Sequence, residues 1–201
     1  MVKIAVKGLL DIASTVLSLA ILAVPFFIIM IVIKATSPGP VLFKQERIGK
    51  NGEKFTLYKF RTMVKGAQDI GLGVEVAFDD SRITPVGRFL RKYSLDEMPQ
   101  LINVLLGEMS IIGPRPALPH QVEKYTEFER NRLKVRPGIT GWAQVNGRNL
   151  LSWEERIKLD IWYIENRSSI IDCQIILKTI KVILSGRGLY GKEGVTKDYG
   201  A

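Results

Sequence analysis

The chain has 201 residues, of which 29 are Lys or Arg and 20 are Asp or Glu. Its net charge of +9 favours an anionic partner, meaning nucleic acid, anionic lipid or a phosphorylated substrate. Cys173 is its only cysteine, which excludes an internal disulfide and favours a reducing compartment. His120 is its only histidine, which excludes a multi-histidine metal site.

The N-terminal segment is strongly apolar. From Ile12 to Ile33 it contains no charged residue, and a helix of that length reaches about 33 Å, enough to cross a bilayer. Pro25 lies near its middle, where it removes one helical hydrogen bond and opposes a straight helix. We therefore predict that residues 1–36 form a re-entrant membrane helix, which enters the membrane, breaks near Pro25 and returns.

Charged residues flank this segment on both sides. Lys3 and Lys7 precede it and Lys34 follows it, so the positive-inside bias pulls both ends to the cytoplasmic face. Lys7 and Asp11 are one helical turn apart and are predicted to pair near the interface, which would offset the cost of an acid at membrane depth. The rest of the chain, residues 37–201, is predicted to be a cytoplasmic domain.

A small antiparallel β-hairpin is predicted at the start of this domain. Residues 41–45 and 55–60 flank a turn that contains Asn51 and Gly52, and this dipeptide supplies the positive φ angles that a tight hairpin needs. The glycine-rich residues 64–80 that follow are predicted to form a surface loop.

Next along the chain, two carboxylates stand side by side in Ser94-Leu95-Asp96-Glu97-Met98-Pro99-Gln100, among several cations. Carboxylates amid arginines suit a divalent metal and phosphate oxygens. Alternatively, Ser94 and Glu97 form a capping box ahead of an apolar helix. Capping leaves Asp96 without a role, and Pro99 fits the first turn of a helix that begins near Asp96 and ends near Gly107. On this segment alone both interpretations stay open.

Further helices are predicted on both sides of this segment. Residues 86–93 have the composition of a short basic helix, and a narrow apolar stripe predicts another one at Val122, Tyr125 and Phe128. Ser152 opens a capping box, S-x-x-E, at the start of a third helix. Residues after Gly188 are glycine-rich and polar, and are predicted to be a loose tail.

The last predicted helix, which begins near Ser169, is the most amphipathic. Its apolar positions recur at helical spacing: Cys173, Ile176, Leu177, Ile180, Ile183 and Leu184. Core packing is the default interpretation of such a stripe. Contact with the membrane is the alternative, and the apolar N-terminal segment strengthens it, because an anchored domain must lie against lipid somewhere.

Basic residues recur beside glycine and proline. The tracts are Lys59-Phe60-Arg61, Gly113-Pro114-Arg115-Pro116, Arg136-Pro137-Gly138 and Asn146-Gly147-Arg148. Glycine lets backbone N–H groups approach an anion, and arginine binds phosphate oxygens bidentately. These tracts and the acidic pair together favour a phosphate site. The sequence has no Walker A motif and no G-x-G-x-x-G, so neither a P-loop nor a dinucleotide fold is indicated.

In combination these motifs resemble the bacterial sugar transferase family, the monotopic phosphoglycosyl transferases that start membrane-bound glycan assembly. The resemblance runs from about Lys7 to about Leu184, and Met98 departs from it, because leucine is usual there. It implies an α+β fold, mainly helical, with a re-entrant (broken) membrane helix anchored through Lys7, Asp11 and Pro25, a small antiparallel hairpin and amphipathic interfacial helices. It also implies the bacterial inner membrane, with the catalytic domain on its cytoplasmic face.

The family's reaction is the transfer of a phospho-sugar from a UDP-sugar to undecaprenyl phosphate, with release of UMP. The resemblance places the nucleophile at Asp96, which a helix N-terminus would keep ionised, and assigns Mg²⁺ to Asp96 and Glu97. By residue type, we assign phosphate or nucleotide contacts to Lys59, Arg61, Arg88, Arg115, Pro116, Arg136 and Arg148.

Two other functional classes fit parts of the sequence. A non-catalytic membrane adaptor that binds polyprenyl phosphate would keep the arginines but would not need both Asp96 and Glu97. A nucleic-acid binder would explain the charge, but aromatic residues suited to base stacking do not interleave with the arginines, so we expect no nucleic-acid partner.

Overall fold

The computed structural model describes the backbone of residues 2–191 and 193–199, and side chains from Lys7 onward. The prediction about Lys3 therefore lies outside the described side chains. The helices are α1 (Val2–Thr36), α2 (Pro85–Lys92), α3 (Gln100–Leu105), α4 (Pro119–Glu123), α5 (Glu127–Arg130), α6 (Trp142–Val145), α7 (Trp153–Asn166) and α8 (Ser169–Ser185). The strands are β1 (Leu42–Ile48), β2 (Lys54–Phe60), β3 (Val76–Ala77), β4 (Ser110–Ile112), β5 (Gly138–Thr140) and β6 (Val195–Thr196).

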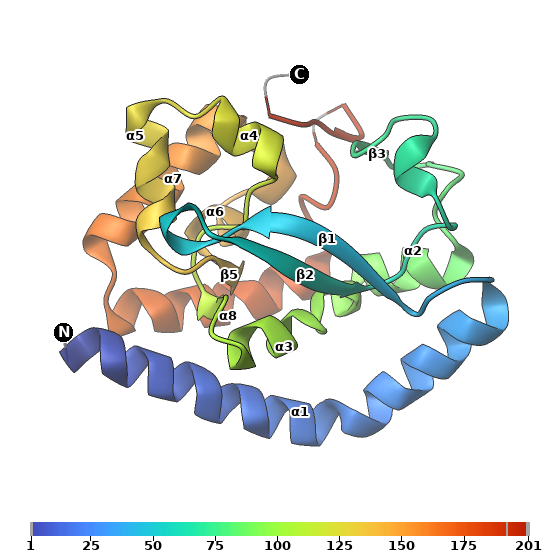
Figure 1. Ribbon diagram of the computed structural model, residues 1–201, viewed down its shortest axis with the longest axis horizontal. Coiled ribbons are helices and arrows are strands. Elements are labelled where there is room, and N and C mark those ends of the chain that lie inside the picture. Colours follow the sequence, from blue (N-terminus) through green and yellow to red (C-terminus); the bar gives the residue numbers. More distant parts are fainter. Residues whose placement is uncertain (1, 192, 200–201) are drawn as a thin grey trace.

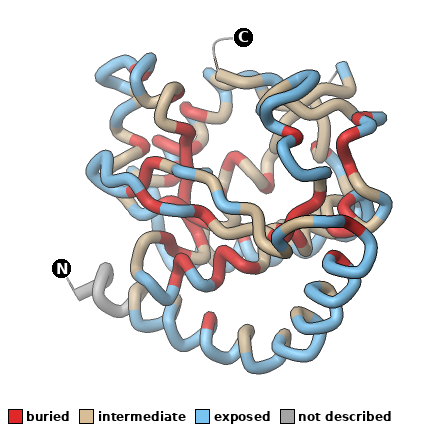
Figure 2. Tube along the Cα trace, turned by 45° about the vertical axis from the view of Figure 1, so that its right-hand side comes forward, coloured by how far each residue is buried: buried red, intermediate tan, exposed pale blue. Residues whose placement is uncertain are grey.

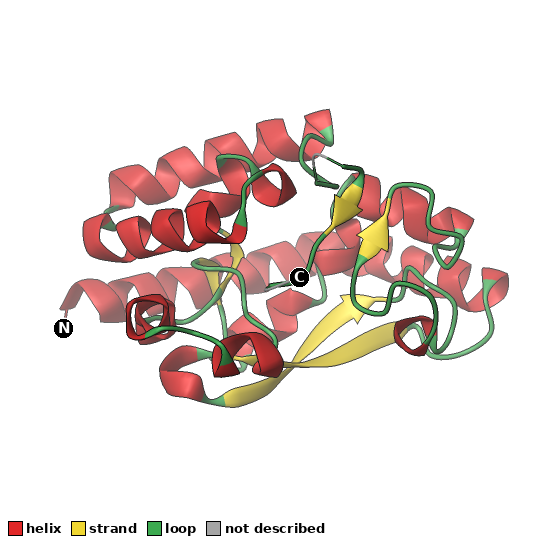
Figure 3. Cartoon of the chain, turned by 90° about the horizontal axis from the view of Figure 1, so that it is seen from above, coloured by secondary structure: helices red, strands yellow, loops and turns green. Residues whose placement is uncertain are grey.

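The predicted mainly helical α+β class is confirmed, and Figure 3 shows how small the strand portion is. The strands form antiparallel pairs β1–β2 and β3–β6 and a parallel pair β4–β5. The predicted hairpin is β1–β2, whose turn has the expected positive φ angles of 58° at Asn51 and 84° at Gly52. Its Phe55 and Leu57 pack against Val104 of α3, so the hairpin and α3 share one core.

Helix α1 is long and apolar enough to cross a membrane, by length and composition. The helix continues through Pro25, so the predicted break in the helix is wrong. The helix bends near its middle instead, as Figure 1 shows. A proline removes one backbone hydrogen bond and kinks a helix without always ending it. Figure 2 shows that most of the described part of α1 is exposed, which is expected of a helix that contacts lipid.

The N-terminal part of α1 is tied to the rest of the chain by polar contacts. Lys7 Nζ lies 2.6 Å from Asp172 Oδ2 in α8. Ser110 Oγ in β4 donates a hydrogen bond of 2.7 Å to Asp11 Oδ2. The predicted pairing of Lys7 with Asp11 is therefore wrong, because each residue has a partner from a distant part of the chain.

The C-terminal part of α1 contacts the same domain through apolar side chains. Ile33 is buried with Phe60 of β2 and Leu90 of α2, and the ring of Phe26 meets Phe60 edge-on at 5.4 Å. Both ends of α1 therefore lie against the domain formed by the rest of the chain, with the exposed apolar middle between them.

Helix α8 presents apolar residues outward. Its Ile175 is fully buried, whereas most of the predicted stripe is exposed, including Leu177 at 64% and Leu184 at 73%. Cys173 is exposed as well. The default expectation of core packing is wrong for these positions, because an amphipathic pattern does not distinguish a core from a lipid surface. The Lys7–Asp172 ion pair holds α8 beside α1.

Two further segments differ from the prediction, and one agrees with it. The apolar stripe is divided between two short helices, with Val122 on α4, Phe128 on α5 and Tyr125 between them. Residues 64–80 form the predicted surface loop, which the buried Arg82 orders by pairing with Asp80 at 2.7 Å and donating hydrogen bonds to backbone carbonyls of the loop. The tail is not loose: β6 pairs with β3, as Figure 1 shows.

Candidate active site

The segment around Asp96 does not form the capping box that was one of its two interpretations. Ser94 has a left-handed φ of 54° and caps no helix; its hydroxyl instead accepts a hydrogen bond of 3.1 Å from Arg148 Nη2. Leu95–Glu97 is a single 3₁₀ turn, and α3 begins only at Gln100. The turn therefore presents Asp96 and Glu97 ahead of the helix, which favours the functional interpretation over capping.

Glu97 is held by two cations. Lys59 Nζ lies 2.9 Å from its Oε1, and Arg115 reaches both carboxylate oxygens, with Nη2–Oε1 at 2.6 Å and Nη1–Oε2 at 3.2 Å. Burial opposes its ionisation, but the charges of Arg115 and Lys59 hold the pKa of Glu97 well below its usual value. Glu97 is thus a fixed anion between two cations.

Asp96 has the opposite surroundings. Its side chain is buried, and no hydrogen bond from the described residues reaches its carboxylate. Burial, and then the charge of Glu97, raise the pKa of Asp96, against the opposing charges of Lys59 and Arg91. The expectation that a helix N-terminus keeps Asp96 ionised is wrong, because α3 starts four residues later. Two adjacent acids with pKa values pushed apart are a recurring feature of catalytic sites.

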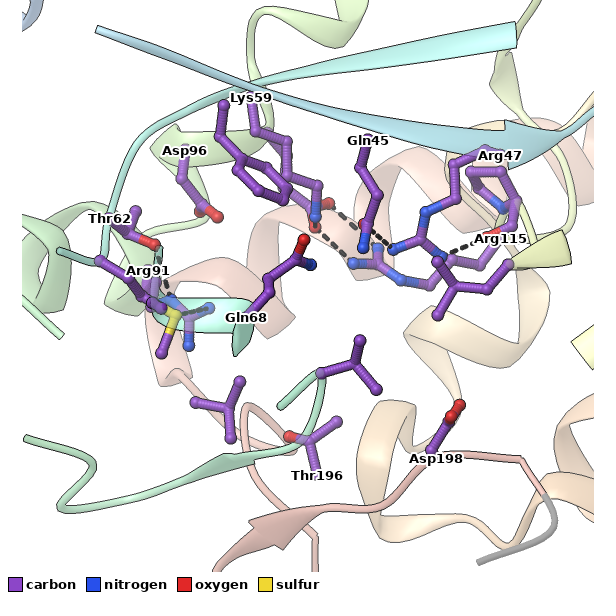
Figure 4. A pocket seen from close by; sticks show the side chains of 18 of the residues that line it. Gln45, Arg47, Lys59, Thr62, Gln68, Arg91, Asp96, Arg115, Thr196 and Asp198 are labelled. Atoms are coloured by element: carbon purple, nitrogen blue, oxygen red, sulfur yellow. Dashed lines mark hydrogen bonds and ion pairs between the residues drawn. The ribbon is translucent and has the colours of Figure 1, made fainter. Parts of the chain in front are cut away.

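Asp96 points into a pocket of about 760 Å³, shown in Figure 4. The wall comes from β1 and β2, the 64–76 part of the loop, the 94–97 turn, the 115–118 segment, α6, α7 and the C-terminal end. Segments that are distant in sequence therefore meet at this pocket, so motifs that are spaced along the whole chain contribute to one site.

Five of the predicted contact residues line this pocket: Lys59, Arg61, Arg115, Pro116 and Arg148. Arg61 differs from the rest, because its guanidinium donates to the carbonyls of Ser37 and Pro38, at 2.7 and 2.6 Å, and so holds the linker after α1. Arg61 therefore has a structural role.

Arg88 and Arg136 are not brought to the pocket. Both are exposed, and neither lines it. Residue type alone had assigned them to phosphate, and the fold directs them to the surface. The pocket instead uses arginines that the motifs did not single out.

Arg47 is the main residue that sequence reasoning missed. Its Nη1 donates to the carbonyl of Pro116 at 3.0 Å, and its Nη2 donates to Gln45 Oε1 at 2.6 Å. Burial, together with the charge of Arg115, lowers the pKa of Arg47 to about 9. A cation destabilised in this way favours an anionic ligand. The sequence feature that could have identified Arg47 is the alternation of side chains along β1, which places Gln45 and Arg47 on one face of the strand.

A second missed cluster joins α7 to the 3₁₀ turn Asn131–Lys134. Arg132 pairs with Asp160 at 2.7 Å, and both are buried. Burial and the charge of Arg115 lower the pKa of Arg156 to about 10. All three residues line the pocket, so arginines outnumber their carboxylate partners at this end.

Glycines in two of the motifs have a packing role that the anion interpretation missed. A Cβ on Gly138 would lie 2.0 Å from the backbone nitrogen of Gly113. Only glycine permits this close approach of β4 and β5. The G-P-R-P and R-P-G motifs therefore bring two backbones together, and this contact positions Arg115 at the pocket.

The resemblance to sugar transferases predicts Mg²⁺ at Asp96 and Glu97. Within the described part of the chain, no group of three or more His, Cys, Asp or Glu side chains gathers to hold a metal. Mg²⁺ usually binds one or two carboxylates together with substrate phosphates and water. Asp96 fits that pattern by chemistry, because no hydrogen bond from the described residues occupies its oxygens and the arginines nearby suit the phosphates that would complete the site. Both oxygens of Glu97 already accept from Lys59 and Arg115, so Glu97 would have to exchange one of these contacts for the metal.

Comparison with known proteins places this chain among sugar transferases. The family model described as bacterial sugar transferase matches residues 2–186. The sugar transferase EpsL of Bacillus subtilis is 42% identical over 192 residues, which cover 96% of this chain and 94% of EpsL.

Two enzymes with more specific names are also similar. The undecaprenyl-phosphate galactose phosphotransferase of Salmonella typhimurium is 39% identical over 92% of this chain. The UDP-glucose:undecaprenyl-phosphate glucose-1-phosphate transferase of Escherichia coli is 40% identical over 85% of it. This chain spans only 41% and 38% of those longer enzymes.

Proposed function

The chain belongs to the bacterial sugar transferase family, and we propose that it transfers a phospho-sugar from a UDP-sugar to undecaprenyl phosphate and releases UMP. The observation that carries this proposal is the contrast between the two acids. Asp96 is buried without a hydrogen-bond donor among the described residues, whereas Glu97 is fixed by Lys59 and Arg115. A non-catalytic lipid-binding adaptor would not need, in the same turn, one acid whose oxygens are free to react and one acid held between two cations.

The reaction has two displacements at one phosphorus. In the first, an oxygen of Asp96 bonds to the sugar-bearing phosphorus of the UDP-sugar, the bond from that phosphorus to the bridging oxygen breaks, and UMP leaves with the bridging oxygen. In the second, an oxygen of the lipid phosphate attacks the same phosphorus, and the Asp96 carboxylate leaves. The products are free enzyme and a polyprenyl diphosphate sugar.

The basic wall of the pocket supports the first displacement. Arg115 and Arg47 face the space beside Asp96, and Arg148 lies on the same side through its bond to Ser94. Arginines that are already fixed by hydrogen bonds stabilise the charge of a diphosphate without reorganising. Bound Mg²⁺ would neutralise the diphosphate and assist departure of UMP, with Asp96 and Glu97 as its protein ligands.

We also propose that α1 is re-entrant and that the protein lies on the cytoplasmic face of the bacterial inner membrane. Lys7 and Asp11 at one end of α1, and Ile33 at the other, contact the same domain. A helix that spans the bilayer would separate these ends by about 30 Å of hydrocarbon. The exposed apolar stripe of α8 would lie beside α1 in the interface, at the depth of lipid phosphates.

The reaction is tested by incubating purified protein with undecaprenyl phosphate, Mg²⁺ and a panel of UDP-sugars. Release of UMP is expected with at least one donor, together with a lipid-linked sugar. Binding of the lipid phosphate without UMP release from any donor would favour the adaptor instead.

The surroundings of Asp96 predict a shifted pH profile after removal of Lys59. The Lys59 charge lowers the pKa of Asp96, so Lys59→Met should raise that pKa further. A raised pKa leaves a smaller ionised fraction at any acidic pH, so the acid limb of kcat/KM should move to higher pH. Lys54→Met on the same strand removes an exposed lysine and should leave the limb in place. A limb that stays put, or moves to lower pH, in Lys59→Met would contradict this reading of the acid pair.

A further inference from the structure

The C-terminal segment, defined here as residues 187–191 and 193–199, lies beyond the part of the chain that the family model matches. The sequence predicted a loose tail, yet the segment makes three separate contacts with the rest of the chain. Because these contacts involve charged groups, aromatic rings and strand pairing, the position of the segment is specified by its own residues.

The first contact joins the segment to the loop over the pocket. Val76 of β3 pairs with Thr196 of β6, and the N–H of Phe78 donates to the carbonyl of Gly194 at 2.9 Å. The ring of Phe78 also meets the ring of Tyr190 edge-on, at 5.5 Å. The loop and the segment therefore form one layer.

The second contact is made by Asp198 with α4. Gln121 Nε2 donates to Asp198 Oδ1 at 2.5 Å, and His120 Nε2 lies 2.6 Å from Asp198 Oδ2. Partial burial opposes ionisation, but the hydrogen bonds from Gln121 and His120 hold the pKa of Asp198 below its usual value. Asp198 is thus an anion with both oxygens engaged, which suits an anchor better than a ligand of substrate.

The third contact is made by Tyr199 with α5 and α7. Its ring meets the rings of Tyr125 and Trp153 edge-on, at 5.4 and 5.5 Å, and its hydroxyl bonds the carboxylate of Glu129 at 2.9 Å. Trp153 Nε1 also donates to the carbonyl of Lys197 at 3.2 Å. The end of the described chain is therefore fixed against α5 and against α7, which lines the pocket.

Held in this way, the segment forms one wall of the pocket. Leu189, Thr196, Lys197 and Asp198 line it, and Figure 4 shows Thr196 and Asp198 across the pocket from Asp96 and Arg115. This wall therefore presents apolar and hydroxyl groups, one lysine that is paired with Glu193, and the anchored Asp198 carboxylate. It is less basic than the arginine side, and such a contrast suits a ligand with a charged part and a hydroxyl-bearing part.

We infer that the C-terminal segment closes the pocket on the donor nucleotide sugar, with Asp198 as the positioning residue that holds it. This inference rests on the proposed function. The segment lies on the side of the domain away from α1, as Figure 1 shows, so it faces the donor that arrives from solvent. The lipid acceptor arrives from the α1 side. Loosening the segment should therefore weaken donor binding and leave acceptor binding unchanged.

The first variant to test is Asp198→Ala in the full chain. Loss of hydrogen bonds to a charged group should raise the KM for the UDP-sugar about tenfold and leave the KM for undecaprenyl phosphate unchanged. Arg187→Gln is the control, because it removes an exposed charge of the same segment at a residue that does not line the pocket. The control should match the wild type in both KM values. A residue with a merely structural role would change both KM values or neither.

A second variant, Tyr199→Ala, removes an independent anchor of the same segment. If both variants release one wall, their effects on donor KM should combine to less than the product of the two. Both variants should also bind UDP more weakly than the wild type, which calorimetry measures without depending on turnover. Unchanged donor KM and UDP affinity in both variants, or an equal rise in acceptor KM, would overturn the inference. Wild-type protein that binds UDP but releases no UMP would contradict the proposed reaction and leave the test of the wall intact.

Discussion

Asp96→Asn is expected to reduce turnover by about three orders of magnitude or more, because a neutral amide cannot form the ester with the phospho-sugar. The variant should stay folded and membrane-bound. Steady-state UMP release with saturating donor and acceptor measures the loss. Turnover close to that of the wild type would show that Asp96 is not the nucleophile.

The same substitution should leave the protein at least as stable as the wild type. The folded-state pKa of Asp96 is raised, so its ionised form is destabilised by folding, and this cost is present at neutral pH, above the unfolded pKa. Asparagine removes the cost. Glu97→Gln should do the opposite: the pKa of Glu97 is lowered, so its charge contributes stability that is present above the unfolded pKa and lost as pH falls. Thermal unfolding at pH 7 should show the two changes in opposite directions.

The second large effect concerns the topology of α1. In a Cys173→Ser background, single cysteines at Val2 and at the exposed Glu193 should both resist an impermeant thiol reagent in intact cells. Both should react after permeabilisation, because a re-entrant helix keeps both sites on the cytoplasmic side. Labelling of the Val2 cysteine in intact cells would mean that α1 spans the membrane.

Two features of α1, the Lys7–Asp172 ion pair and the bend at Pro25, are expected to stabilise this topology. Lys7→Met removes the ion pair with Asp172, and Pro25→Leu removes the cause of the bend. Each should allow part of the population to span, and the two together should allow more. Labelling of the Val2 cysteine in the double variant measures that fraction. A fraction no larger than in the wild type would show that neither contact holds the topology.

Local features were predictable because their causes are local. The turn at Asn51 and Gly52 follows from their tolerance of positive φ, and the Ser152 capping box forms as expected, with the hydroxyl accepting from Glu155 N–H and the Glu155 carboxylate accepting from Ser152 N–H. The acidic pair was recognisable because two adjacent carboxylates among cations suit a divalent metal and phosphate oxygens. Its local structure was left open between a capping box and a helix that begins near Asp96, and neither forms: the Ser94 hydroxyl accepts from Arg148, and α3 begins at Gln100.

Partners that are distant in sequence could not be predicted in this way. Lys7 has an acid one turn away, but the fold supplies Asp172. The role of Arg47 could not be predicted from β1 alone, because it depends on the 115–118 segment that the fold brings beside it. The sequence left the α8 stripe open between core packing and membrane contact, because burial in a core and contact with lipid select the same apolar residues.

The central claim is that Asp96 becomes covalently bound to the phospho-sugar. Wild-type protein mixed with a productive UDP-sugar and Mg²⁺, without lipid, and quenched rapidly, should release UMP in a burst and gain the mass of one phospho-sugar. The adduct should map to the peptide that contains Asp96 and be absent from Asp96→Asn, and adding undecaprenyl phosphate should discharge it. No adduct under rapid quench, together with kinetics of a ternary complex, would contradict the claim and favour direct attack by the lipid phosphate.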